Sequence, residues 1–208
     1  DGKFKTTLVQ GLNLVIMLIV PAAVGLFVLA HPIVALLYER GEFTPTDTVQ
    51  TARVLQLLVI GLSFAAVDQM LIFAFYARKD TLTPSAVGVV SVVVYLVTAL
   101  ALIGPFGLFS LMIADSLKQM SHALITGWLL SRRIGGFRGT SLVSTLIKCV
   151  AASALVGGTY HGFAPNLAPP VQSAWWVVTL LLVCATSAAM AVTLMEELLP
   201  AGQQRAAR

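Results

Sequence analysis

Charge is what this sequence has least of. Only 11% of its 208 residues are Asp, Glu, Lys or Arg, whereas soluble domains carry roughly 25%. Hydrophobic residues make up 58% of the chain. In water, a chain of this composition would expose apolar side chains over most of its surface. A soluble globular domain is therefore excluded, and the lipid bilayer is the expected solvent.

The sequence is also short of residues that carry chemistry. Its two cysteines, Cys149 and Cys184, both lie inside apolar runs, where we expect them to pack as small hydrophobic side chains. It has no His and Cys cluster with metal-ligand spacing, no phosphate-binding glycine loop, no nucleophile elbow and no catalytic carboxylate pair. We therefore expect no metal site, no cofactor and no enzymatic activity.

Six apolar runs are long enough to cross a membrane as helices, which takes about 20 residues. Backbone groups in lipid must be satisfied within their own segment, and no barrel-like alternation is present, so helices are expected. The runs lie at residues 8–30, 52–77, 84–103, 107–130, 141–163 and 173–195. The predicted fold class is all-α, a polytopic membrane protein with six transmembrane helices.

Turn residues separate these runs. Residues 33–38 form an expected amphipathic extension of the first span, which Gly41 ends. Thr44 is the predicted N-cap of the second helix, with Pro45 at its first position and Asp47 three residues after the cap.

The later boundaries are predicted in the same way. Thr83 and Pro84 are expected to begin the third span as Thr44 and Pro45 begin the second. The pair at 104–105, Gly-Pro, is expected to separate the third span from the fourth, and the glycines at 135–136 to end the fourth.

The formal net charge is +4, but the basic residues form short clusters between apolar runs, so no nucleic-acid partner is expected. One side of the predicted topology receives only Arg40 and Arg53. The other receives Lys3, Lys5, Arg78, Lys79, Arg132, Arg133, Arg138, Arg205 and Arg208. Because cytoplasmic loops are enriched in Lys and Arg, both termini are predicted to lie in the cytoplasm.

The fourth span carries an unusual set of polar residues. Asp115, Lys118, Gln119, His122 and Thr126 share one helical stripe, on which Asp115 can pair with Lys118. An ionisable group at the centre of a span costs at least about 2.5–3.5 kcal/mol, so each needs a reason. We expect the stripe to line a water-filled cavity where Lys118 and His122 meet an anionic head group. The alternative is a buried polar seam that only fixes helix packing.

The second span adds two further candidate cavity residues, Asp68 and Gln69. Asp68 is too short to reach the membrane surface, so it should face protein or water. It is expected either to pair with Lys118 across a helix interface or to be protonated, and the sequence leaves both options open.

Three stretches in the first half resemble a known family. They are "VPAAVGL" at 20–26, "LLYERGEFT" at 36–44 and "FAFYARKDTLTP" at 73–84, and the fourth span, "IADSLKQMSHALI", fits the same pattern. In this order and spacing they resemble the MurJ/MviN family of lipid II flippases, in the MATE-like transporter superfamily.

The resemblance implies an architecture and an activity. The family has fourteen spans, of which these six resemble the last six: residues 1–135 would be the last four helices of the C-terminal lobe, and 136–208 two additional helices that form a groove for a lipid tail. The implied activity is movement of the undecaprenyl-linked peptidoglycan precursor across the bacterial cytoplasmic (inner) membrane by alternating access. Six residues are the candidates for the substrate site, and they rest on physical arguments and match no family motif: Asp68, Gln69, Asp115, Lys118, Gln119 and His122.

The implied partners are membrane lipid, the undecaprenyl-linked substrate, and either the missing N-terminal transporter half or a larger membrane complex. The chain begins Asp1-Gly2-Lys3 without an initiator methionine, so we expect a piece of a longer protein. Two other functions stay open. One is a non-transporting subunit that scaffolds or stabilises a membrane complex. The other is an exporter of a different polyprenyl-linked oligosaccharide or of a small drug-like cation.

Overall fold

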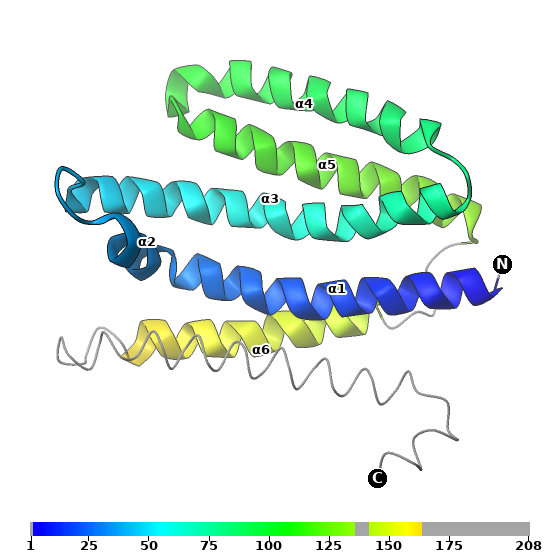
Figure 1. Cartoon of the computed structure of the whole chain (residues 1–208), viewed down its shortest axis with the longest axis horizontal. Helices are drawn as coiled ribbons and strands as arrows, with labels where there is room; N and C mark the ends of the chain where they lie inside the picture. The colour runs from blue at the N-terminus through cyan, green and yellow to red at the C-terminus, as the bar shows by residue number, and fades with distance from the viewer. Residues whose placement is uncertain (1, 136–141, 164–208) are drawn as a thin grey trace, which may run out of the picture. The chain divides into compact units, whose positions relative to one another are not determined.

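The computed structural model describes residues 2–135 and 142–163, and within them all regular structure is helical (Figure 1). The helices are α1 (Gly2–Val28), α2 (Ala30–Tyr38), α3 (Pro45–Ala77), α4 (Leu82–Phe106), α5 (Phe109–Arg133) and α6 (Leu142–Phe163). The chain divides into two compact units. The first spans Leu26–Gly139, and the second combines Gly2–Gly25 with Thr140–Arg208.

The all-helical membrane fold predicted from the sequence is confirmed. Five of the predicted spans correspond to α1, α3, α4, α5 and α6, while the sixth, at 173–195, lies outside the described residues. By length and composition, α1, α3 and α4 are apolar enough to cross a membrane. Helix α5 is as long as α4 but carries Asp115, Lys118, Arg132 and Arg133, which make it far less apolar.

The second unit contributes two described helical segments. On α1, residues such as Leu8, Leu12 and Ile16 are buried at helical spacing. On α6, Thr145, Cys149 and Ser153 are buried one turn apart, so they form one stripe. The expected packing of Cys149 as a buried side chain is confirmed, and Cys184 lies outside the described residues.

In the first unit, the predicted start of α3 is confirmed. The Thr44 N–H donates to Asp47 Oδ2 at 2.9 Å, and the Asp47 N–H donates to Thr44 Oγ1 at 3.4 Å, which is a complete capping box. Residues 33–38 belong to a separate short helix, α2, whose Ala30 and Val34 pack against Ala52 of α3.

The predicted start of the third span at Thr83 is wrong by a few residues. Helix α4 begins at Leu82, and Thr83 lies in its first turn. The cap is supplied instead by Asp80, whose carboxylate accepts from the Thr83 N–H at 3.0 Å and from the Thr83 hydroxyl at 2.6 Å. Because Asp80 satisfies the backbone N–H three residues on, it takes the role that the sequence pattern assigned to threonine.

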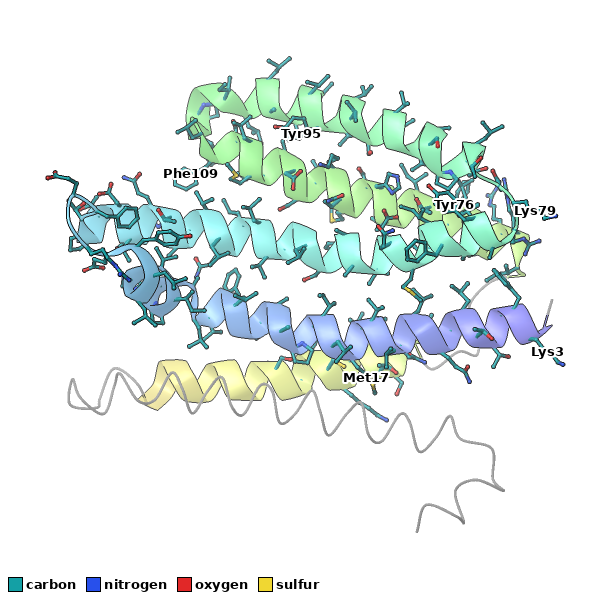
Figure 2. The ribbon with its side chains drawn as sticks, in the orientation of Figure 1. Lys3, Met17, Tyr76, Lys79, Tyr95 and Phe109 are labelled. Atoms are coloured by element: carbon teal, nitrogen blue, oxygen red, sulfur yellow. The ribbon has the colours of Figure 1, made fainter. Side chains whose placement is uncertain are left out.

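The turn before this cap contains the one non-glycine residue of the described chain with a left-handed backbone, Lys79, at φ 60°. The Lys79 N–H donates to Tyr76 O at 2.9 Å and the Asp80 N–H donates to Phe75 O at 3.0 Å. These two bonds form a Schellman motif, a position usually given to glycine. Figure 2 shows Lys79 at this turn, near Tyr76.

Arg133, the last residue of α5, joins this turn to the rest of the unit. Its guanidinium forms an ion pair with Asp80 and donates to Thr83 Oγ1 at 3.0 Å. It also lies 5.2 Å from the ring centroid of Phe75. The end of α5 is therefore held against both the end of α3 and the start of α4.

The predicted break at the Gly-Pro pair 104–105 is also wrong. Helix α4 continues to Phe106, and the chain turns at Gly107, whose φ is +53°. Pro105 lies in the last turn of α4, where its missing N–H removes a single helical hydrogen bond, the one to the Ala101 carbonyl. The predicted end of α5 is confirmed at Gly135, where φ is +74°.

Helix α5 packs against both α3 and α4, and the three form a layer with α5 in the middle (Figure 1). The α3–α5 contact is closest where Ser116 Oγ donates to the Leu57 carbonyl at 2.7 Å. A methyl group built on Gly61 would lie 2.8 Å from Ser116 Cα. Only a glycine fits there, so this crossing fixes the position of α5 along α3.

We expect Gly61→Ala to destabilise the protein by about 1–3 kcal/mol, because the added methyl would overlap the α5 backbone. Thermal unfolding in detergent measures the effect. The matched control is Gly104→Ala, where a methyl meets nothing within 4 Å. Alanine is the better helix former, so the control should be neutral or stabilising. Equal behaviour of the two variants would contradict the close crossing.

Acid should weaken the Asp80 cluster. Hydrogen bonds from the Thr83 side chain and backbone, together with Arg133, lower the pKa of Asp80 from 3.8 to about 2. A depressed folded-state pKa means that stabilisation is fully present above pH 3.8 and is lost as pH falls towards 2. The difference in melting temperature between wild type and Asp80→Asn should therefore shrink across this range. Glu42→Gln, on an exposed turn, controls for the loss of one negative charge.

Candidate functional site

The polar residues of α5 lie in the middle of the three-helix layer, so they are held by contacts from both sides. Ser116 is bonded to α3, and Lys118 lies 5.7 Å from the ring centroid of Tyr95 on α4. Figure 2 shows Tyr95 projecting from α4 towards α5. Because α3 and α4 are much more apolar than α5, they surround a polar helix with two apolar ones.

The predicted pairing of Asp115 with Lys118 is confirmed. Lys118 Nζ lies 2.5 Å from Asp115 Oδ1, one turn away on the same helix. The pair is not sealed in the interior, because the Lys118 and Asp115 side chains are 27% and 36% exposed. Two opposite charges therefore lie open on the surface of this unit, in the middle of a helix expected to span the membrane.

Asp68 is paired with His122 and not with Lys118, the partner that the sequence analysis had considered. Asp68 Oδ2 on α3 lies 2.7 Å from His122 Nδ1 on α5. The partner is not Lys118, whose Nζ is held by Asp115. Both members of the Asp68–His122 pair are nearly covered, with 8% and 11% of their side chains exposed. This pair links two helices at a depth where lipid offers no hydrogen bonds.

Some polar atoms around this pair have hydrogen-bond partners and others have none among the described residues. The Thr126 hydroxyl donates to the His122 carbonyl at 2.7 Å and lies 3.3 Å from Nδ1. Asp68 Oδ1 is buried and has no hydrogen-bond partner among the described residues. The His122 Nε2 atom faces α4 at Gly88, where an added methyl would lie 3.9 Å away.

The two glutamines are placed differently. Gln119 is half-buried on α5 beside the ion pair, whereas Gln69 is exposed on α3 while its neighbour Asp68 is buried. Successive helical residues point about 100° apart, so Asp68 and Gln69 cannot both face α5. The structure thus brings together Asp68, Asp115, Lys118, Gln119 and His122 around α5, and leaves Gln69 outside.

Three residues of this region were not among the sequence-based candidates: Gly88, Tyr95 and Ser116. Each contacts α5 or belongs to it and faces another helix. A glycine within a helix is a weak sign of close backbone approach, but the sequence does not say which helix approaches. Among the described residues, no group of three or more His, Cys, Asp or Glu side chains is arranged to hold a metal ion.

The sequence model of the family described as "Lipid II flippase MurJ" matches residues 1–194. The chain belongs to this family. A probable lipid II flippase MurJ of Bdellovibrio bacteriovorus is 32% identical over 152 residues, which cover 73% of this chain and 29% of that protein. The corresponding protein of Rhizobium meliloti is 31% identical over 165 residues, or 79% of this chain and 31% of that protein.

A solved structure is similar as well. "Lipid II flippase MurJ, inward closed conformation" superposes with a TM-score of 0.71 over 95% of this chain and 41% of that one, at 21% sequence identity. This likeness supports the fold. The chain spans less than a third of the length of these two curated MurJ proteins. It is a multi-pass membrane protein of a transporter family.

Proposed function

We propose that this chain is the C-terminal portion of a lipid II flippase, which moves an undecaprenyl-linked peptidoglycan precursor across the bacterial cytoplasmic membrane by alternating access. The family match over residues 1–194 gives the class of activity. The observation that locates the proposed substrate-binding site is the partly exposed Asp115–Lys118 pair on α5.

Charges at membrane depth cannot remain open to lipid. Each costs about 2.5–3.5 kcal/mol or more at the centre of a span. The exposed side of Asp115 and Lys118 must therefore face water or other protein. A transporter provides such a surface in its central cavity.

Lys118 is suited to an anionic head group. Its ammonium has three N–H donors, of which one is used by Asp115. The remaining donors are available to a diphosphate, and Asp115 holds the side chain near Tyr95 while the cavity is empty. Gln119, one residue further along α5 and half-buried, adds neutral donors and acceptors beside it.

We also propose the family's topology for this chain. Residues 1–135 supply the last four helices of the C-terminal lobe and residues 136–208 two additional helices for the lipid tail, with both termini in the cytoplasm. The Arg133–Asp80 contact supports the orientation, because it places the basic ends of α3 and α5 at one side of the unit. The remaining transporter helices are the partner needed to complete a cavity.

Complementation tests the proposal. The full-length gene that contains this sequence should restore growth to a bacterial strain depleted of its own lipid II flippase. Lys118→Ala should impair rescue and weaken lipid II binding about tenfold or more, since a hydrogen bond to a charged group contributes about 1.5–3 kcal/mol. The paired variant Asp115→Asn/Lys118→Gln removes both charges without leaving one unpaired, and it should show the same binding defect.

Lys3→Ala is the control, because Lys3 is an exposed lysine at the start of α1 and lies outside the proposed site. It should rescue growth like wild type. Failure of the well-expressed wild-type gene would overturn the flippase assignment and favour the scaffolding alternative. Equal lipid II binding by the Lys118→Ala variant would overturn the site. Tighter binding of another polyprenyl diphosphate would mean that this lipid, and not lipid II, is the cargo.

A further inference from the structure

The Asp68–His122 pair has features that helix packing does not require. It joins α3 to α5 at 2.7 Å, it is nearly covered, and one carboxylate oxygen, Asp68 Oδ1, has no partner among the described residues. A packing contact at this depth is better made by neutral groups, because an ionised carboxylate in an apolar interior carries a large desolvation cost.

We propose that Asp68 and His122 form a proton-binding site between α3 and α5, which takes up and releases a proton at His122 Nε2. The short Nδ1–Oδ2 contact assigns the hydrogen on Nδ1 to the bond with the Asp68 carboxylate. Nε2 then has a free lone pair on the opposite edge of the ring, on the side of α4.

The charge balance of the pair favours a role in proton exchange. With a neutral ring, the pair carries one uncompensated negative charge. When a proton from water binds to the Nε2 lone pair, the ring becomes an imidazolium and the pair becomes neutral as a whole. No bond other than N–H forms, and Asp68 remains a carboxylate throughout. A buried site therefore changes its net charge by one unit with no large side-chain movement.

The neighbouring ionisable groups do not remove this imbalance. On α5, Asp115 and Lys118 neutralise one another one to two turns away. On α3, the other charged residues are Asp47 and Arg53, near the start of the helix. Helix α4 contains no Asp, Glu, Lys, Arg or His, and its Tyr95 faces Lys118. Within this unit the proton at His122 is thus the change that balances Asp68.

Gly88 lies where protonation of His122 can affect the neighbouring helix α4. Its missing side chain leaves room beside Nε2, because a methyl group added at Gly88 would lie 3.9 Å from that atom. A proton added to Nε2 turns this edge of the ring into a donor and places a positive charge where α5 faces α4. We infer that the site couples proton binding to the packing of these helices. Its use in driving transport rests on the proposed function.

Nitrogen NMR of the full-length protein labelled at histidine tests the site without any transport assay. The His122 signal is assigned by comparison with His122→Gln. Lowering the pH should add a hydrogen at Nε2 while Nδ1 keeps its own, and the neutral form should be the Nδ1–H tautomer. In Asp68→Leu, which removes the acceptor, the neutral ring should lose this tautomer. Asp68→Asn, which keeps an acceptor oxygen but no charge, should retain the tautomer and shift the titration.

The matched control is His31→Gln, because His31 is an exposed histidine of α2 in the same unit. Its removal should leave the His122 signals unchanged. A ring that keeps one protonation state over the whole accessible pH range would overturn the proposal. So would a titration that is identical in Asp68→Leu, or signals that respond to sodium and not to pH.

A second arm tests the coupling. Lipid II flipping by the full-length protein in vesicles should respond to an imposed pH gradient, and His122→Gln should lose that response. Absence of flipping in wild type with a normal His122 titration would contradict the flippase function and leave the proton site standing. Flipping that ignores the gradient in wild type would overturn the coupling alone.

Discussion

The architecture of the first unit depends on one constraint: the polar groups of α5 must be satisfied by neighbouring helices, because lipid provides no partner for them. The Ser116 hydroxyl uses a backbone carbonyl of α3, and His122 uses the Asp68 carboxylate. Both contacts join α5 to α3 and come in the same order along the two helices, so α3 and α5 run parallel. Few other placements of α5 would leave these groups bonded.

Close approach and end contacts then fix the details. Gly61 removes the side chain that would separate α3 from α5, and the hydroxyl bond at Ser116 forms in the space that results. At the other end, Arg133 holds the Asp80 cap. The turn at Lys79 adopts a conformation that costs roughly 1–2 kcal/mol for a residue with a side chain. Its two Schellman hydrogen bonds and the Asp80 contacts oppose that cost, so the turn is held by its surroundings more than by local preference.

The sequence was informative where structure is local. Apolar run lengths located the described helices, and the Thr44 and Asp47 spacing identified a cap. The start of α4 was misplaced by two residues, because the Asp80 carboxylate caps the helix by accepting from Thr83, and Arg133, about fifty residues away, adds a contact to that carboxylate. The i, i+3 spacing also gave the Asp115–Lys118 pair. It could not choose a partner for Asp68, since that choice depends on which residues meet across two helices. Residue spacing along one helix carries no such information.

The polarity of α5 has a consequence for how the protein is made. Helices α3 and α4 are long and apolar enough to cross a membrane, whereas α5 is not among the helices with that property. Both precede α5 in the chain, so they have already been synthesised when α5 emerges from the ribosome. Until then Asp68 has no histidine to meet, and until α5 docks its own charges have no protein around them. Retention of α3 beside the channel until α5 arrives would let Asp68 and His122 enter the bilayer already paired.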